Sequence, residues 1–376
     1  MNPLVPAYGT ASLADLSSSL LAAVGADGDN PLDLAPAGRV LLFLVDGMGA
    51  ELLRAHPGVA PFLSSLPGGV SGGVLTAGFP ATTVTSLGTL GTGVPPGGHG
   101  MLGYQLAVPG AGYLLNCLRW TAPGPLVEPG EWQPTPTVYE RAVAAGVPVS
   151  YVGPAKFETT GFNRAVYRGV RFVGADEVDD RIEGVRHALA AEPRAHVSVY
   201  YGDLDSTGHL TGWGSPAWLD QLALVDRMAE RLAETLPPNS AMYVTADHGM
   251  INVADRVDID TLPALREGVT LLGGEARARH LYTAPGASAA VLDTWREVLA
   301  GKAWVVSREE AVESGWFGPE IRPEWLPRIG DVLAVPYTDC ALVASVAEPH
   351  EAGFLGCHGS LTPAEQHVPL LEVSTR

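Results

Sequence analysis

The sequence predicts an α/β fold with a mainly parallel central sheet and helices on both faces. Short continuous apolar runs, such as RVLLFLV at 39–45, are typical of strands that are buried on both faces of a parallel sheet. These runs alternate with segments whose apolar residues recur at helical spacing, most clearly over 218–236. Such alternation indicates strand–helix–strand units. In addition, three of the runs lead into segments that contain aspartate.

Local patterns predict each element in order. Apolar residues at helical spacing predict helices over 12–23, 137–145, 178–191, 218–236 and 287–299. Two further helices are expected, one that follows the first strand and runs through Arg54 and one that begins after Pro80. Apolar runs predict strands over 39–45, 147–152, 196–201, 241–246, 269–272, 280–284, 304–307 and 332–335. The Gly- and Pro-rich segment 25–38 is expected to be a loop. Residues 99–120 predict an outlying hairpin, and the tail to Arg376 a last short strand or helix.

The character of the chain changes after residue 250. Between 251 and 345, short strands alternate with a helix, and many charges and prolines lie between them. We therefore expect residues 251–345 to form a smaller α/β insertion that caps the main sheet. Residues 1–250 and 346–376 would then form the core domain. The length of 376 residues is sufficient for this organisation.

Composition excludes several classes of function. The formal net charge of −18 argues against a nucleic-acid polymer or an anionic membrane as partner. A small anionic substrate remains compatible, because bound divalent metals reverse the local field. The three cysteines contain no CxxC pair, which fits a reducing compartment. The N-terminus lacks a basic signal-peptide region and no run has the length of a membrane span, so the expected location is cytoplasmic.

The stretch 79–100 contains a candidate nucleophile. Pro80 ends an extended segment, and the hydroxyl-rich residues after it are suited to begin a helix. A hydroxyl there lies among free N–H groups at the positive end of the helix dipole. That environment suits a nucleophile that becomes an alkoxide and meets an anionic phosphoryl group. Threonine is also a common helix cap, so this stretch alone leaves both interpretations open.

Aspartates and histidines follow the ends of the predicted strands. Asp46 follows the first strand, where an N-cap role is the alternative, and the other two strands lead into DLDSTGH and DHGM. The carboxyl edge of such a sheet is where open α/β folds bind ligands. Mixed nitrogen and oxygen ligands without thiolate suit two Zn²⁺ ions, with Mn²⁺ also possible. The candidate ligands at this edge, with the hydroxyl of Thr83, are Asp46, Asp205, His209, Asp247, His248 and His358.

These motifs together resemble the alkaline phosphatase superfamily, specifically its nucleotide pyrophosphatase/phosphodiesterase branch. The resemblance spans most of the chain and follows the order of motifs in that family. The matching segments are VDGMG at 45–49, FPATTVTSLGTLGTGVPPGGHG at 79–100, DSTGH at 205–209, ADHGM at 246–250 and GCHGS at 356–360.

The resemblance implies an alkaline phosphatase-like fold and a phosphodiesterase or nucleotide pyrophosphatase with two zinc ions. Thr83 would be the nucleophile, forming a covalent phosphothreonine. Asp46, Asp247 and His248 would hold one zinc beside Thr83. The other zinc would be held by Asp205, His209 and His358.

Two positions depart from the family pattern. Ser86 stands where the family often has an asparagine that holds a phosphate oxygen, and Thr82 stands where it has a lysine. The Ser86 hydroxyl is the expected substitute donor. Tyr104 is a candidate to stack on the substrate, with simple packing as the alternative.

Other residues near the motifs compete for roles. The spacing to His209 favours Asp205 over Asp203 as ligand. His99 is expected to order the loop after the nucleophile helix, and Cys357 to be packed. From the predicted insertion, Arg279 and His280 are candidates to reach the site.

The expected substrate is a small phosphate ester or nucleotide. A singly charged diester is favoured because neither Thr82 nor Ser86 supplies a cation, and no Arg or Lys lies between Arg54 and Arg119. The alternatives are a phosphomonoesterase or phosphonate hydrolase on the same scaffold, or a catalytically silent zinc-binding protein.

Overall fold

The central sheet has six strands in the order β18-β8-β1-β7-β5-β6. The computed structural model describes residues 2–68 and 71–375. All of these strands run parallel to their neighbours except β18, which is antiparallel to β8. The prediction of a mainly parallel central sheet is therefore confirmed. The strands are β1 (Arg39–Val45), β5 (Val149–Gly153), β6 (Arg171–Gly174), β7 (Ala195–Tyr201), β8 (Ser240–Thr245) and β18 (Leu371–Thr375).

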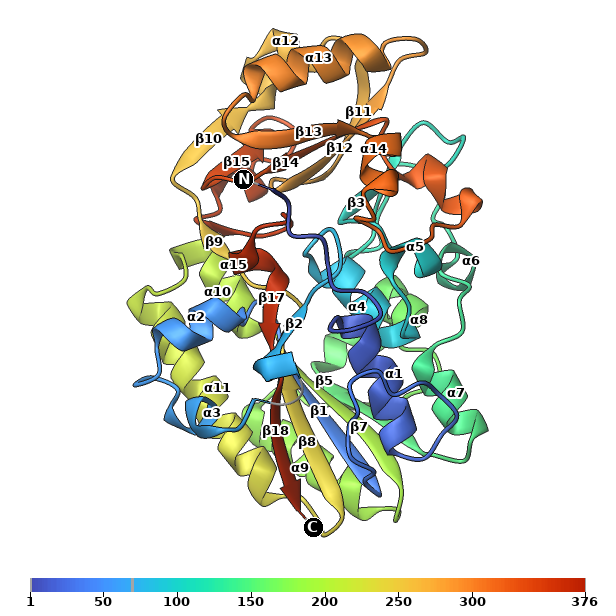
Figure 1. Cartoon of the computed structure of the whole chain (residues 1–376), viewed down its shortest axis with the longest axis vertical. Helices are drawn as coiled ribbons and strands as arrows, with labels where there is room; N and C mark the ends of the chain where they lie inside the picture. Colours follow the sequence, from blue (N-terminus) through green and yellow to red (C-terminus); the bar gives the residue numbers. More distant parts are fainter. Residues whose placement is uncertain (1, 69–70, 376) are drawn as a thin grey trace.

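Helices cover this sheet. Every residue of β7 and β8 is buried, which requires cover on both faces. Helix α9 (Val178–Ala190) packs against β5 and β7, and α11 (Pro216–Glu234) packs beside it. Helix α7 (Val138–Ala144) packs against β5 and also contacts α1 (Leu13–Ala23) and α4 (Thr83–Thr92). Figure 1 shows these helices around the sheet.

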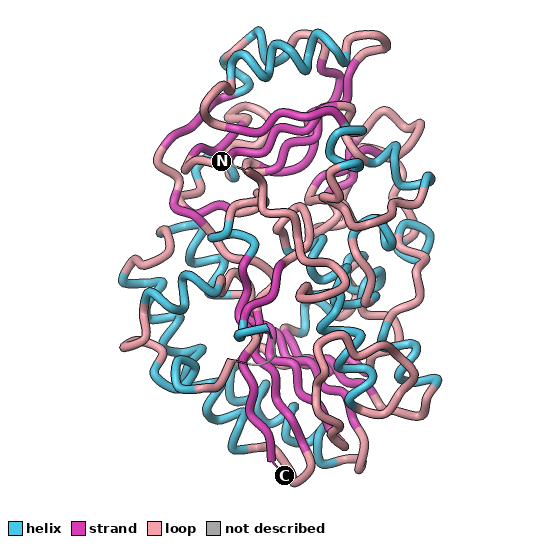
Figure 2. Tube along the Cα trace, viewed as in Figure 1, coloured by secondary structure: helices cyan, strands magenta, loops and turns pink. Residues whose placement is uncertain are grey.

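A second, antiparallel sheet lies at the other end of the molecule (Figures 1 and 2). Its order is β11-β12-β14-β13, and it has its own buried apolar cluster around Trp295 of α13 (Ser288–Val298). The sequence predicts all four strands, but their assignment to a separate cap over 251–345 stays a prediction. The strands are β11 (Val269–Glu275), β12 (Ala278–Thr283), β13 (Ala303–Ser307) and β14 (Val332–Pro336).

Shorter elements connect the two sheets. The predicted hairpin is present as β3 (Gln105–Ala107) and β4 (Leu114–Asn116). The remaining short strands pair as β2 (Val74–Thr76) with β17 (His367–Pro369), β9 (Ile251–Asn252) with β16 (Gly356–Cys357), and β10 (Asp255–Asp258) with β15 (Cys340–Val343).

The remaining α-helices are α2 (Ala50–Ala55), α3 (Pro61–Ser65), α5 (Pro96–His99), α6 (Pro129–Trp132), α8 (Gly161–Val166), α10 (Asp203–Thr211), α12 (Pro263–Arg266), α14 (Arg308–Glu313) and α15 (Pro363–Gln366).

The strand order brings three chain segments to one edge of the central sheet. Strand β1 lies between β7 and β8, and the three are parallel. The segments that begin at Asp46, Gly202 and Ala246 therefore leave the sheet side by side. In Figure 1 this carboxyl edge faces the second sheet. The predicted ligand residues are thus placed between the two sheets.

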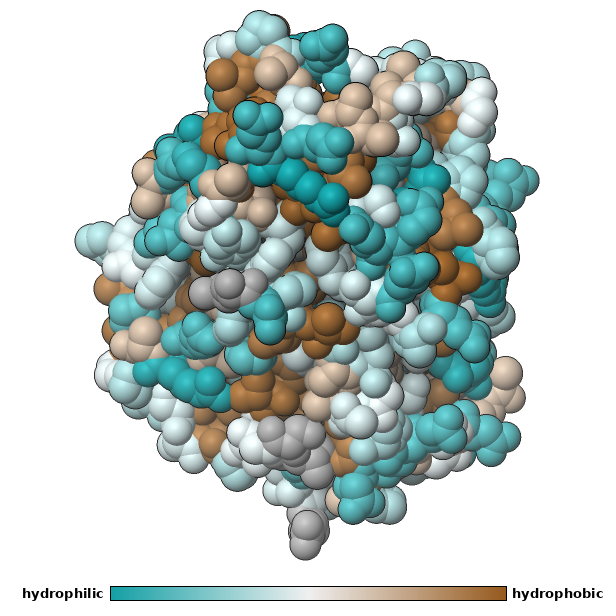
Figure 3. Space-filling view, turned by 45° about the horizontal axis from the view of Figure 1, so that its top comes forward, coloured by the Kyte–Doolittle hydropathy of each residue, from teal (hydrophilic) through white to brown (hydrophobic). Residues whose placement is uncertain are grey.

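The surface seen in Figure 3 is mixed, with hydrophilic residues prevailing and apolar ones scattered among them. Among the described residues, none of the helices is both long and apolar enough to cross a membrane.

Candidate active site

Helix α4 presents Thr83 at its first turn. Thr82 is the N-cap residue, with extended backbone, yet its side chain does not cap the helix. Its hydroxyl donates instead to Oε2 of Glu275, at 2.9 Å. The first N–H groups of α4 therefore lack a side-chain acceptor from Thr82, and the Thr83 hydroxyl lies at the positive end of the helix.

Thr83 contacts two of the predicted ligand residues. Its Oγ1 lies 3.3 Å from Nε2 of His248 and 3.4 Å from Oδ2 of Asp46. The same Nε2 lies 3.3 Å from Asp46 Oδ1 and 3.4 Å from Asp247 Oδ2. The carboxyl ends of β1 and β8 and the start of α4 thus form one cluster.

A second cluster adjoins the first. Asp205 and His209 are one turn apart on α10, with Oδ2 and Nε2 3.2 Å apart. His358 directly follows β16, whose pairing with β9 carries it to the sheet edge. Its Nε2 lies 3.8 Å from Oδ1 of Asp205. The His358 ring stacks on that of His248, with centroids 3.6 Å apart, so the two clusters are contiguous.

The three histidines share one tautomer. Nδ1 lies 2.8 to 2.9 Å from a backbone carbonyl in each: Gly356 for His209, Gly249 for His248 and Ala81 for His358. Because a carbonyl only accepts hydrogen bonds, Nδ1 carries the proton in the neutral ring. The lone pair of each Nε2 is then free for a metal, which is the usual arrangement of metal-bound histidine.

Two carboxylate oxygens of the site lack a hydrogen-bond donor among the described residues. Oδ1 of Asp247 accepts from the N–H groups of Gly47 and His248, at 3.0 Å each. Oδ2 of Asp247 and Oδ1 of Asp205 are buried without a hydrogen-bond partner among the described residues. Burial, together with the charge of Asp46, raises the pKa of Asp247 well above its ordinary value. Such oxygens fit a bound cation.

Two sets of side chains have the geometry of a metal site. In each set the ligand atoms lie within 4.8 Å of one another. One set is the predicted triad of Asp205, His209 and His358. The other joins Asp46 and His248 with Asp205, whereas the predicted set has Asp247 in that place. All six predicted ligand residues are brought together, and their division between two ions stays a prediction.

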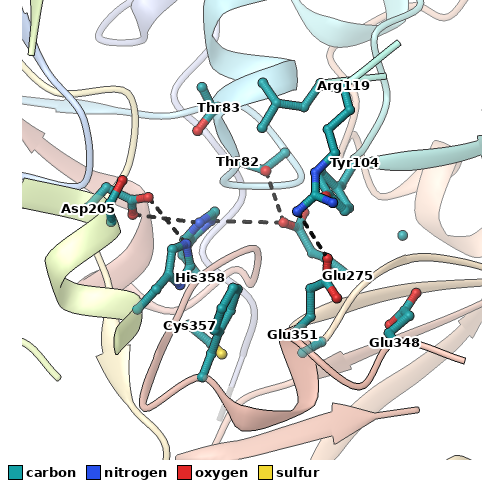
Figure 4. Close-up of a pocket in the computed structure, with 16 residues that line it drawn as sticks. Thr82, Thr83, Tyr104, Arg119, Asp205, Glu275, Glu348, Glu351, Cys357 and His358 are labelled. Atoms are coloured by element: carbon teal, nitrogen blue, oxygen red, sulfur yellow. Dashed lines mark hydrogen bonds and ion pairs between the residues drawn. The ribbon is translucent and has the colours of Figure 1, made fainter. Parts of the chain in front are cut away.

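Two adjoining cavities open at Thr83 and have different linings. We call the first, of about 290 Å³, the acidic lobe; it is lined by Glu275, Glu348, Glu351, Tyr104 and Phe354, among others. Figure 4 shows its side chains. We call the second, of about 480 Å³, the aromatic lobe; its lining includes Tyr151, Lys156, Phe157, Phe162 and Tyr200. Both lobes are lined by Thr83, Leu118, Arg119, Asp205 and Ser206.

Of the residues predicted to contact the substrate, one lines a cavity and the others do not. Tyr104 lines the acidic lobe, in agreement with its expected position. Ser86 is fully buried and lines neither lobe, and its hydroxyl has no hydrogen-bond partner among the described residues. Its role in phosphate binding stays a prediction. Arg279 and His280 are buried and line neither lobe.

The expected role of His99 is confirmed. Its Nδ1 accepts from the N–H of Met101 at 3.1 Å, and its Nε2 lies 3.0 Å from the hydroxyl of Thr89 on α4. The side chain is fully buried and lines neither lobe. It therefore orders the loop that follows the helix.

Sequence reasoning missed two side chains of the site. Tyr200 donates its hydroxyl to Oδ2 of Asp46 at 2.5 Å, although its place in a buried strand gives no such signal. Glu275 lies at the end of β11, far along the chain from any motif. Burial raises its pKa to about 8, against the opposing effect of the Thr82 hydrogen bond.

Comparisons with known proteins identify the family of the chain and match its fold. Murine ectonucleotide pyrophosphatase/phosphodiesterase 5 has a similar structure, with a TM-score of 0.71, 17% identity and coverage of 89% of this chain and 88% of that one. Phosphonoacetate hydrolase from Sinorhizobium meliloti has a TM-score of 0.66 and 19% identity over 91% of each chain. A search of curated protein sequences gave no match. The model of the type I phosphodiesterase / nucleotide pyrophosphatase family matches residues 40–361, and the chain therefore belongs to that family.

Proposed function

We propose that the protein is a dinuclear zinc phosphodiesterase or nucleotide pyrophosphatase that acts through a covalent phosphothreonine at Thr83. The observation that carries this proposal is the position of the Thr83 hydroxyl. It lies at the start of α4, within 3.5 Å of Asp46 and His248, and lines the same cavity as Asp205, His209 and His358. A hydroxyl that served only as a cap would have no need of this surrounding donor set.

The donor set fits two zinc ions. His209 and His358 with Asp205 would hold one, and His248 with Asp46 and Asp247 the other. Mixed nitrogen and oxygen ligation suits zinc, with manganese as an alternative. When bound, the ions would lower the pKa of the attacking hydroxyl and stabilise charge on the phosphoryl oxygens and the leaving group.

Within this site the chain's own groups have distinct tasks. Thr83 loses its proton and its Oγ1 forms a bond to phosphorus, while the ester bond breaks and the leaving group departs with the bonding electrons and takes up a proton. The uncapped N–H groups at the start of α4 are placed to bind a phosphoryl oxygen. Tyr200 holds Asp46 through its hydroxyl. Water then cleaves the phosphothreonine and restores the Thr83 hydroxyl.

A diester is the substrate class that the site favours. Acidic side chains line one lobe, and Arg119, which lines both lobes, lies 3.6 Å from the carboxylate of Glu351. A phosphomonoester dianion would meet more repulsion here than a diester monoanion. One solved structure of the murine relative is an inactive threonine-to-alanine variant in complex with AMP, which supports both a nucleotide group and a threonine nucleophile.

Phosphonate hydrolysis is the second candidate. It is favoured by the structural likeness to phosphonoacetate hydrolase, which was solved with phosphonoacetate. We also propose that residues 251–345 form a cap, because the turn after β11 brings Glu275 into the site. A cytoplasmic location and a small soluble substrate complete the proposal.

Paired substrates test this function directly. The zinc-loaded protein is expected to hydrolyse an aryl nucleotide diester with a kcat/KM at least about tenfold above that for the matching aryl monoester, or about 1.4 kcal/mol of transition-state binding. A preference for the monoester would contradict the diesterase assignment. Turnover of phosphonoacetate in preference to both esters would favour the second candidate.

Variants of α4 test the nucleophile. Thr83→Ala is expected to bind metal yet lose several orders of magnitude in kcat, and Thr83→Ser to retain part of it. Thr85→Val is the matched control, because Thr85 lies in the same turn, is buried and lines neither lobe. Wild-type turnover in the alanine variant would show that Thr83 is only a structural residue.

A further inference from the structure

Glu275 lines the acidic lobe from a constrained position in the chain. It ends β11, and the turn to β12 is fixed on either side of it. A Cβ on Gly274, whose φ is +74°, would lie 2.0 Å from the carbonyl oxygen of Ala278, so this turn requires glycine. The fully buried Arg277 binds both carboxylate oxygens of Glu365, at 3.0 and 2.6 Å. The carboxylate of Glu275 is therefore preorganised.

Among the described residues, hydrogen-bond donors reach only one of the two carboxylate oxygens of Glu275. Oε2 accepts from the Thr82 hydroxyl, while Oε1 is buried without a hydrogen-bond partner among the described residues. In the described part of the chain no Lys or Arg forms an ion pair with Glu275. Nδ1 of His358 lies 4.0 Å away and donates to the carbonyl of Ala81. Figure 4 shows the carboxylate projecting into the lobe.

The other two glutamates of the lobe have cationic partners, and its fourth acid, Asp205, belongs to the predicted metal ligands. Glu348 binds Arg279 at 2.7 Å and Gln105 at 2.9 Å, and Glu351 pairs with Arg119 at 3.6 Å. Among the described glutamates of the lobe, Glu275 therefore has no cationic partner, and its ionised form carries a charge that a cationic ligand would balance. A buried acceptor without a donor is costly, and a ligand that supplies the donor recovers that cost.

We infer that Glu275 makes the acidic lobe a subsite for a hydrogen-bond-donating substituent of the phosphodiester, with a primary ammonium group bound best and a hydroxyl group next. The inference rests on the proposed function and narrows its substrate class. An ammonium group donates to Oε1 and also balances the carboxylate charge, and such charge-assisted bonds are the stronger ones. The half-buried ring of Tyr104 lines the same lobe, and an aromatic face is suited to a cation. A methyl group in the same place leaves Oε1 unpartnered.

Three isosteric esters test this inference. They are the 3-aminopropyl, 3-hydroxypropyl and n-butyl esters of 4-nitrophenyl phosphate, which differ only in the terminal group and release the same chromophore. For the zinc-loaded wild-type protein we expect kcat/KM to follow that order, with the aminopropyl ester about tenfold above the butyl ester. The hydroxypropyl value shows how much of the gain is due to the hydrogen bond and how much to the charge.

Glu275→Gln is the variant that locates the effect. Its amide oxygen keeps the bond from Thr82 and places an amide donor in the lobe, so the aminopropyl-to-butyl ratio is expected to fall below threefold. Glu158→Gln is the matched control, because it removes the same charge from an exposed residue that lines neither lobe, and it is expected to keep the ratio.

The possible outcomes distinguish failure of the subsite from failure of the proposed function. A wild-type aminopropyl-to-butyl ratio below threefold overturns the inference even if the variant does not fold, and so does a ratio that Glu275→Gln leaves unchanged. Hydrolysis of all three esters at similar rates would leave the diesterase function standing without the subsite. Hydrolysis of none of them by the zinc-loaded protein would overturn both proposals.

Discussion

Three histidines outside the ligand set are buried in places that keep them neutral. Burial lowers the pKa of His99 and His280 to about 3, with smaller contributions from Arg328 and Arg308, and lowers that of His196 to about 4. In the unfolded chain a histidine titrates at about 6.5. Below that pH the unfolded state binds protons that the folded state does not, so acid favours unfolding.

His196 is the residue that best isolates this effect. Both of its ring nitrogens lack hydrogen-bond partners among the described residues. We expect the free energy of unfolding to fall as pH drops from about 6 to 4.5, by up to about 1.4 kcal/mol per pH unit for each such histidine. His196→Leu should reduce the slope of the unfolding free energy against pH by the contribution of one histidine. Urea unfolding across this pH range measures the slope.

The exposed His187 provides the control. His187→Gln replaces a histidine outside the buried set, and its unfolding is measured in the same way. Because acid also protonates the metal ligands, only the difference between the variants and the wild type is informative. An unchanged slope in His196→Leu would show that His196 is protonated in the folded protein.

At the scale of single residues, the sequence predicts the site residues that directly follow the ends of strands. Asp46 and Asp247 directly follow apolar runs, and parallel strands must deliver them to one edge. Glu275 and Tyr200 could not be found in this way. Glu275 ends a strand of the second sheet and Tyr200 lies within a buried strand, and both reach the site only through the tertiary arrangement of the two sheets.

Among the elements, most helices and strands follow from periodicity, whereas their pairing does not. The sequence predicts β11 and β12 as separate strands, but nothing in it indicates that their turn enters the site. Nor does it predict α10, since DLDSTGHLT lacks a clear apolar face. The helix nevertheless places Asp205 and His209 one turn apart.

The β11–β12 turn depends on one buried ion pair. Arg277 and Glu365 are both fully buried, and Arg277 also donates to the carbonyl groups of Thr338 and Cys340. Arg277→Met is expected to lower the free energy of unfolding by about 3–5 kcal/mol, because it leaves the Glu365 charge without its partner. Urea unfolding measures this loss.

A double-mutant cycle separates the pair from its surroundings. Adding Glu365→Gln to Arg277→Met removes the unpaired charge and should recover part of the loss, so the double variant is less destabilised than the sum of the two single variants. Strict additivity of the two losses would show that the pair does not couple the turn to α15.

For the stability of the whole molecule, the position of the negative charges matters more than their total. The net charge of −18 is spread over the chain, but Asp46, Asp205 and Asp247 are drawn together where the two sheets meet. Burial of like charges opposes folding unless a cation joins them. Folding and metal binding are therefore expected to be linked.

This linkage gives a prediction for metal removal. The purified protein should contain close to two zinc ions per chain by elemental analysis, and His358→Ala should lose one of them. Exhaustive chelation should abolish turnover and lower the Tm by on the order of 5–10 °C, since a ligand at a thousand times its Kd contributes about 4 kcal/mol. Both effects should reverse on adding zinc. Active protein without a transition metal, or a Tm unaffected by chelation, would contradict the two-zinc assignment, because the buried carboxylates would then be stabilised without a cation.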